Sequence, residues 1–154
     1  PEVAPNMLEL EIVESAALGD IQHVGKLILA CQQELGVRFA LDDFGTGYSS
    51  LTQLEGLPVD VVKVDRQFVV RLADGGTRHE VFLSALVELV SALDLQLIVE
   101  GVETESERDA LISAGFRVGQ GYLFGRPAPP PDALHLALAD ERVGGVGTRL
   151  RLDQ

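Results

Sequence analysis

The stretch Leu41–Ser50 (LDDFGTGYSS) joins the end of an apolar segment to two adjacent carboxylates and two glycines. Residues 37–41 (VRFAL) predict a strand, and residues 49–55 predict a short helix after the glycine loop. Hard divalent cations prefer carboxylate oxygens, and one aspartate can bridge two metal ions while its neighbour binds one. The stretch therefore predicts a strand–loop–helix unit with a candidate two-metal site at the strand end. The alternative is an Asp-rich turn before a helix, with Ser49 or Ser50 as its N-cap.

The same alternation of strand and helix extends in both directions from this stretch. Strands are expected at residues 8–13, 60–64 and 95–99 and within 116–123, and helices at residues 24–35, 78–93 and 105–114. This rhythm predicts an α/β fold with a parallel sheet and crossover helices. About five strands do not close a (β/α)8 barrel, which typically needs about 250 residues. We therefore expect a partial TIM-like (β/α) barrel.

The longest predicted helix, residues 78–93, is apolar over most of its circumference. It is covered either by the rest of a larger barrel or by a second copy of the chain. The proline-rich run Pro127–Pro131 (PAPPP) ends the predicted domain. We therefore expect one domain over residues 1–130, and a C-terminal region over residues 131–154 with a short helix at 132–140 and a mobile tail.

Composition argues against several classes of function. The chain has 12 Lys and Arg residues against 24 Asp and Glu residues, a net charge of −12, which disfavours binding to a nucleic acid polymer. An anionic substrate then requires a local cation, and a divalent metal ion is the obvious candidate. The 3 histidines are scattered and do not predict a His-based metal site.

Other features of the sequence indicate a cytoplasmic protein without a membrane segment. No apolar run reaches the roughly 18–20 residues that span a membrane. The N-terminus lacks the basic and small-residue features of a signal peptide. The single cysteine, Cys31, permits no internal disulfide and is expected to be a small core residue.

Polar side chains gather at the ends of the predicted strands, where (β/α) barrels carry their chemistry. Besides Asp42 and Asp43, these positions hold Glu11, Glu14, Lys63, Asp65, Glu100, Glu103 and Gln120. A lysine on an apolar strand, such as Lys63, is costly unless it is paired. Taken singly, each carboxylate is more often a solvated surface group, and Glu103 suits the first turn of a helix. Together they predict a two-metal site that clamps a phosphate and generates hydroxide.

The chain resembles EAL domains over residues 7–129. Five segments stand in the order and at the spacing found in that family: LELEIVES (8–15), LDDFGTGYSSL (41–51), VDVVKVDRQFV (59–69), LIVEGVET (97–104) and GQGYLFGRP (119–127). The resemblance implies an eight-stranded TIM-like barrel with one antiparallel strand. It also implies hydrolysis of cyclic di-GMP to the linear dinucleotide pGpG with two divalent cations, Mg²⁺ or Mn²⁺.

The resemblance also implies a role for each residue of the candidate site. The metal ligands would be Glu11, Asp42, Asp43 and Glu100, and Glu100 is also a candidate general base. Glu14 would stabilise the loop after the aspartate pair, and Lys63 would orient the attacking water and stabilise phosphate charge. Outer groups that hold metal-bound water would be Glu103 and Gln120. The substrate-binding residues would be Asp65, Gln120 and Arg126.

Two parts of the family pattern are not found in the chain. The E-A-L motif, whose glutamate is a metal ligand, is absent, as is the strand that carries a ligand asparagine. The chain also begins without Met, which favours a piece of a longer catalytic protein, with N-terminal sensor or GGDEF domains in the parent. A swapped dimer, in which a second copy replaces the missing strands, is the second explanation. We expect the chain to form a homodimer but to show little or no activity alone.

Two other functions compete with cyclic di-GMP hydrolysis. The first is a degenerate EAL module that binds cyclic di-GMP or a partner protein without catalysis. The retained aspartate pair, Lys63, Glu100 and Gln120 argue against it, because a module relieved of catalysis has no physical reason to keep buried charges. The second is a two-metal phosphohydrolase that acts on another phosphodiester.

Overall fold

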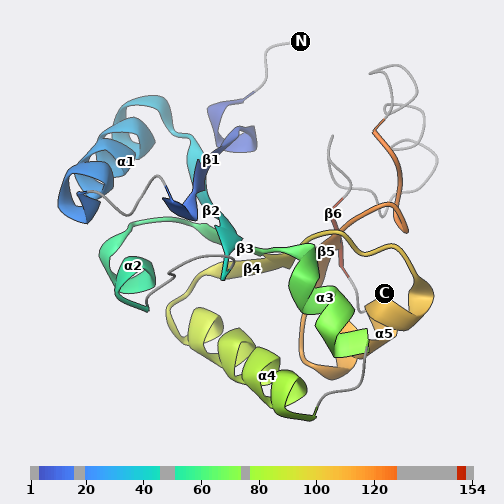
Figure 1. Cartoon of the computed structure of the whole chain (residues 1–154). Coiled ribbons are helices and arrows are strands. Elements are labelled where there is room, and N and C mark those ends of the chain that lie inside the picture. The colour runs from blue at the N-terminus through green and yellow to red at the C-terminus, as the bar shows by residue number, and fades with distance from the viewer. Residues whose placement is uncertain (1–3, 16–19, 46–50, 74–76, 128–148, 152–154) are drawn as a thin grey trace. The chain divides into compact units, whose positions relative to one another are not determined.

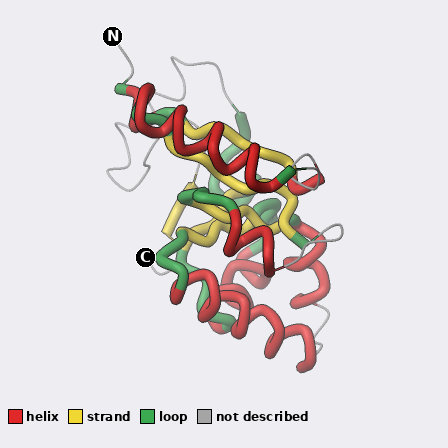
Figure 2. The backbone as a smooth tube through the Cα atoms, turned by 90° about the vertical axis from the view of Figure 1, so that its left-hand side faces the viewer, coloured by secondary structure: helices red, strands yellow, loops and turns green. Residues whose placement is uncertain are grey.

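In the computed structural model, residues 4–15, 20–45, 51–73, 77–127 and 149–151 are described. They form two units, one made of residues 1–65 and 90–96 and the other of residues 66–89 and 97–154. Strands and helices alternate along most of the described chain, except that two helices follow one another at residues 66–92 (Figures 1 and 2). No helix within the described ranges has both the length and the apolar character needed to cross a membrane.

The first unit is built on parallel strands. Its elements are the 3-10 turn η1 (Pro5–Met7), β1 (Glu9–Val13), α1 (Ile21–Leu35), β2 (Arg38–Phe44), α2 (Leu51–Gly56) and β3 (Val61–Val64). β1 pairs with β2 and β2 pairs with β3, both in parallel. Helix α1 packs against β2 and α2 (Figure 1). This is the parallel arrangement with crossover helices that the sequence predicted.

Helix α1 has the boundaries that its capping residues predict. The Asp20 side chain accepts a hydrogen bond from the backbone N–H of His23 at 3.0 Å, which satisfies a free donor of the first turn. Gly36 ends the helix in the left-handed conformation, with a φ of 70° that a residue without Cβ adopts readily. Cys31 on this helix is only partly buried, so the expectation that it belongs to the core is wrong.

The second unit contains α3 (Arg66–Ala73), most of α4 (Thr77–Ala92), most of β4 (Gln96–Val99), α5 (Glu105–Ser113), β5 (Val118–Gln120) and β6 (Arg149–Arg151). β4 pairs in parallel with β5, and β6 pairs antiparallel with β5. The sequence predicted neither α3 nor β6; it assigned residues 149–151 to a tail. The helix predicted at 132–140 lies outside the described residues.

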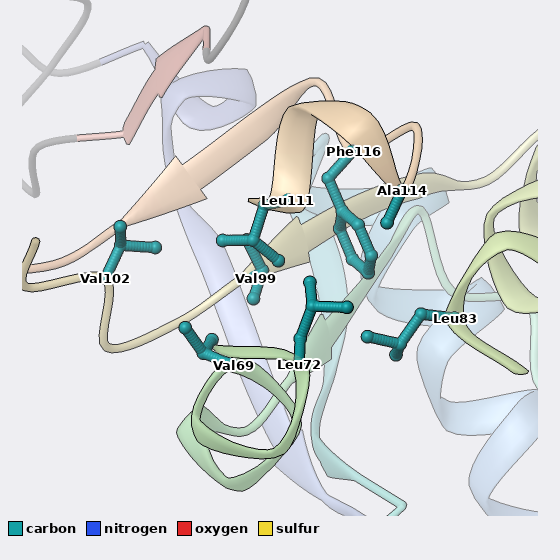
Figure 3. Packing of buried hydrophobic residues seen from close by; sticks show 8 residues of the cluster. All are labelled: Val69, Leu72, Leu83, Val99, Val102, Leu111, Ala114 and Phe116. Carbon is teal, nitrogen blue, oxygen red and sulfur yellow. The ribbon is translucent and has the colours of Figure 1, made fainter. Parts of the chain in front are cut away.

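The core of the second unit joins its helices to its sheet. Figure 3 shows the buried side chains of Val69, Leu72, Leu83, Val99, Val102, Leu111, Ala114 and Phe116 in one cluster. Val69 and Leu72 come from α3, and Leu111 from α5, and these two helices contact each other. Burial of this apolar surface is what holds the strand ends and the following loops in place.

Helix α4 is only partly covered by the described residues. Its side chains Leu83 and Leu86 are buried, whereas Val81 and Phe82 are exposed. The Phe82 ring stacks on Phe68 and His79, with ring centroids 6.1 and 6.3 Å away. The exposed side of α4 is the part for which the sequence predicted a cover, either the rest of a larger barrel or a second copy of the chain.

Replacing Leu111 by Ala should lower the free energy of unfolding by about 2–5 kcal/mol, because it opens a cavity in a closely packed cluster. The neighbouring Ile112 lies on the outer side of the same helix with 37% of its surface exposed. Ile112→Ala is the matched control and should cost less than about 1 kcal/mol. Chemical denaturation of the chain measures both, and equal losses would contradict the assigned core.

Candidate active site

A β-bulge places the two aspartates of the DDFG segment. Leu41 pairs with Val62, and Phe44 with Val64, so Asp42 and Asp43 together stand opposite the single residue Lys63. Asp43 has a φ of 57°, in the left-handed region that few residues other than glycine enter. Adjacent side chains of a regular strand point to opposite faces. The bulge changes that alternation at the two carboxylates.

Lys63 is the centre of the polar contacts in the first unit. It lies on β3, whose residues are all buried, and its own side chain is 4% exposed. Its Nζ lies 2.6 Å from Oε1 of Glu11 on β1 and 3.5 Å from Oδ1 of Asp42 on β2. A buried ammonium is costly without a partner. Carboxylates from both preceding strands supply the pairing that the apolar strand requires.

Glu14 contacts the beginning of the loop that follows the aspartate pair. Its side chain is 2% exposed, and Oε2 accepts a hydrogen bond from the backbone N–H of Gly45 at 3.1 Å. This contact supports the predicted role of Glu14 in stabilising that loop. The rest of the loop, residues 46–50, lies outside the described residues, as do the proposed N-caps Ser49 and Ser50.

The carboxylates repel one another in this arrangement. The pKa of Asp43 is raised above its ordinary value of 3.8. Burial is the largest cause, and the negative charges of Asp42 and Asp65 come next. Glu14 adds to the increase, and the positive charge of Lys63 opposes it. The first unit therefore concentrates more negative charge around Asp43 than Lys63 compensates.

This donor set fits a hard divalent cation in its chemistry. Oδ1 of Asp42 is buried and makes no hydrogen bond within the described part of the chain. A cation would satisfy such an oxygen and relieve the repulsion at Asp43. Among the described residues, there is no group of three or more Asp, Glu, His or Cys side chains placed closely enough to hold a metal ion. The predicted ligand set thus stays a prediction.

The remaining predicted site residues belong to the second unit. Glu100, Glu103 and Gln120 line one pocket of about 290 Å³, together with Arg66, Gly101, Gly121 and Tyr122. The guanidinium of Arg126 lies over the Tyr122 ring, 4.5 Å from its centroid. A larger hollow of about 360 Å³ lies between α1 and α2, and none of the predicted site residues lines it.

Sequence reasoning missed Arg66 and Tyr122. Arg66 directly follows Asp65 in the VDRQFV segment, and Tyr122 follows Gln120 by two residues in GQGYLFGRP, so both stood inside segments that had already been singled out. Nothing in the local pattern showed their contacts. Arg66 binds both carboxylate oxygens of Glu103, each at 2.5 Å.

Comparison with known proteins decides the family. The EAL domain model matches residues 2–127. The chain belongs to the EAL domain family. The predicted resemblance is confirmed, and so is the α/β fold of the TIM-like type, because solved EAL structures match the chain closely.

One curated relative and two solved structures illustrate the relationship. The chain is 41% identical over 130 residues to the bifunctional diguanylate cyclase/cyclic di-GMP phosphodiesterase MucR of Pseudomonas aeruginosa, covering 84% of this chain and 19% of that protein. A structure of the MucR phosphodiesterase in complex with cyclic di-GMP has a TM-score of 0.74 at 38% identity, covering 84% of this chain and 52% of the other. A manganese and cyclic di-GMP complex of BlrP1 from Klebsiella pneumoniae has a TM-score of 0.73 at 32% identity, covering 82% and 32%.

The chain spans only about a fifth of the length of such curated relatives, between 16% and 21% for three of them. The matched region of these relatives is therefore their EAL domain, and most of their length lies outside the comparison.

Replacing Asp43 by Asn should stabilise the metal-free chain at neutral pH. The raised pKa means that the folded state disfavours the ionised carboxyl, so wild-type stability rises as the pH falls through the folded-state pKa towards 3.8. The advantage of the variant should therefore shrink over the same interval. Asn also tolerates the left-handed backbone at this position.

Thermal unfolding in the presence of a chelator, followed against pH, measures this difference. Asp109→Asn, at an exposed site on α5, is the control for the same replacement outside the site. A lower midpoint for Asp43→Asn at neutral pH would contradict the electrostatic argument.

Proposed function

We propose that the chain carries part of the active site of a cyclic di-GMP phosphodiesterase, which hydrolyses one phosphodiester bond to give linear pGpG. The names of MucR and of the cyclic di-GMP phosphodiesterase PA2567, which is 40% identical over 123 residues, support this substrate. The observation that carries the proposal is the buried Lys63 ammonium between carboxylates of two neighbouring strands, opposite the bulged aspartates.

The residues that would hold the cations are Glu11, Asp42, Asp43 and Glu100. Two divalent cations, Mg²⁺ or Mn²⁺, would activate a water molecule and neutralise phosphate charge when bound. The manganese complex of BlrP1 supports a divalent ion. The negative charges around Asp43 and the buried Asp42 oxygen without a hydrogen bond support cation binding at the first unit.

Several side chains of this chain would act on the substrate directly. Lys63 presents a fixed positive charge in a buried setting, where it stabilises negative charge that develops on a phosphate far better than in water. Glu100 is the candidate base for the attacking water. Gln120 lines the pocket of the second unit beside Tyr122, and Arg126 lies over the Tyr122 ring, so a polar group and a stacking surface are available to a nucleotide. Asp65 is proposed as a further substrate contact.

The family resemblance also supports proposals on domain boundaries, oligomeric state, location and neighbouring domains. We infer a domain over residues 1–130, a homodimer, a cytoplasmic location, and N-terminal sensor or GGDEF domains in the parent protein. The geometry argues against a degenerate module that only binds cyclic di-GMP. The left-handed backbone of Asp43 and the buried Lys63 both lower stability, and a module without catalysis would not need them.

Hydrolysis of cyclic di-GMP by the full-length product of the gene that encodes this chain tests the proposal. Chromatography with Mn²⁺ or Mg²⁺ should show pGpG as the product. Lys63→Met and Asp42→Asn should each lower kcat by about 100-fold or more, because they remove charge that acts on the reacting phosphate. Lys26→Met, at an exposed lysine of α1, should leave kcat unchanged.

Thermal unfolding of each variant separates loss of chemistry from loss of fold, and Asp42→Asn preserves the side-chain shape if Lys63→Met does not fold. Binding of cyclic di-GMP without any pGpG would favour the degenerate module instead. Equal cleavage of unrelated dinucleotides would indicate a general phosphodiesterase. The 154-residue chain alone is expected to show little or no turnover.

A further inference from the structure

The turn that follows β4 is held from one side by Arg66. Both terminal nitrogens of its guanidinium donate to Glu103, Nη1 to Oε1 and Nη2 to Oε2. Two parallel bonds set the orientation of a carboxylate as well as its distance. These two bonds use two of the five N–H donors of the guanidinium.

The side-chain stem of Arg66 lies directly over Gly101. A Cβ at position 101 would come within 2.6–2.9 Å of Cβ, Cγ and Cδ of Arg66, and the φ of Gly101 is 74°. Only glycine permits both this conformation and this approach. Arg66 thus covers the residue next to Glu100 with its stem and binds the third residue after Glu100 with its head group.

The other side of the turn is held by backbone contacts. The carboxylate of Glu107 accepts the backbone N–H groups of Glu103 and Thr104, both at 2.8 Å. The N–H of Val102 donates to the carbonyl of Gln120 at 3.1 Å, and the carbonyl of Val102 accepts from Leu123 at 3.0 Å. Val102 itself is fully buried in the core. The far side of the turn is therefore fixed to α5, to β5 and to the segment after β5. Among the described residues, Arg66 is the partner that holds the side chain of Glu103.

We propose that Arg66 is a positioning residue, which through Glu103 and Gly101 fixes the direction of Glu100 for the reaction. This inference rests on the proposed function, because it assigns Arg66 to the same site. It gives Glu103 the role of a link between Arg66 and the turn, in addition to its predicted role in holding metal-bound water. The pair is partly exposed, 46% for Arg66 and 35% for Glu103, so it contributes little to stability. Its removal affects activity much more than folding.

Kinetics of the full-length protein test the proposal. Arg66→Met and Glu103→Gln should each lower kcat by about 10- to 100-fold, the usual effect of losing a group that orients a ligand. KM for cyclic di-GMP and the unfolding midpoint should change little. The double variant should be no worse than the worse single variant, because both remove the same interaction. Arg66→Lys should be intermediate, since a single ammonium cannot form both bonds.

The matched control is Arg108→Met on α5, which removes a comparable exposed ion pair with Asp109 and should leave kcat unchanged. A rise in KM with unchanged kcat, or multiplicative losses in the double variant, would show that Arg66 binds substrate independently of Glu103 and would overturn the proposal.

Amide hydrogen exchange provides a readout that does not depend on activity. Arg66→Met should raise exchange at residues 101–103 several-fold, while the amides of α5 exchange as in wild type. Unchanged exchange at 101–103 would overturn the positioning role even if kcat fell. If the wild-type protein hydrolyses no cyclic di-GMP, the proposed function fails, and the exchange experiment still decides whether Arg66 holds the turn.

Discussion

The ammonium of Lys63, buried within β3, is the constraint on which the first unit depends. It is tolerated only because Glu11 from β1 and Asp42 from β2 reach it. Those contacts require the three strands to lie in one register, with Val13 opposite Asp42 and the bulge opposite Lys63. A shift of one residue would turn the paired carboxylates to the other face. Strand register and the arrangement of the polar site are therefore set by the same interaction.

The second unit holds its polar groups in a different way. Its pocket is bordered by a turn whose central residue, Val102, is part of the hydrophobic core shown in Figure 3. Gly121 approaches that residue so closely that a Cβ would lie 2.1 Å from the Val102 carbonyl oxygen. The turn is thus packed against the core at Val102. Polar contacts from Arg66 and Glu107 then hold Glu103, which follows Val102 in this turn.

The aspartate pair of the first unit has features that lower the stability of the fold. Asp43 combines a left-handed backbone with a raised pKa, and Asp42 keeps a buried oxygen without a hydrogen bond among the described residues. A strained backbone and a buried oxygen without a hydrogen bond persist where the surrounding structure enforces them, commonly at functional sites. A divalent cation bound there would reduce the repulsion at Asp43 and give the Asp42 oxygen a partner besides the Lys63 ammonium.

Local patterns in the sequence determined the parallel α/β fold, the end of α1 at Gly36 and the need of Lys63 for a partner, because each follows from periodicity or from the chemistry of a single residue. The predicted strand-end positions of Glu11, Asp42 and Asp43 are wrong, since Glu11 lies in the middle of β1 and both aspartates lie within β2. Tertiary structure alone decided the bulge at Asp42 and Asp43, since ordinary alternation would send adjacent side chains to opposite faces. It also decided that Arg66 binds Glu103, 37 residues away. Contacts between distant segments depend on how strands and helices are packed, and no local pattern records that packing.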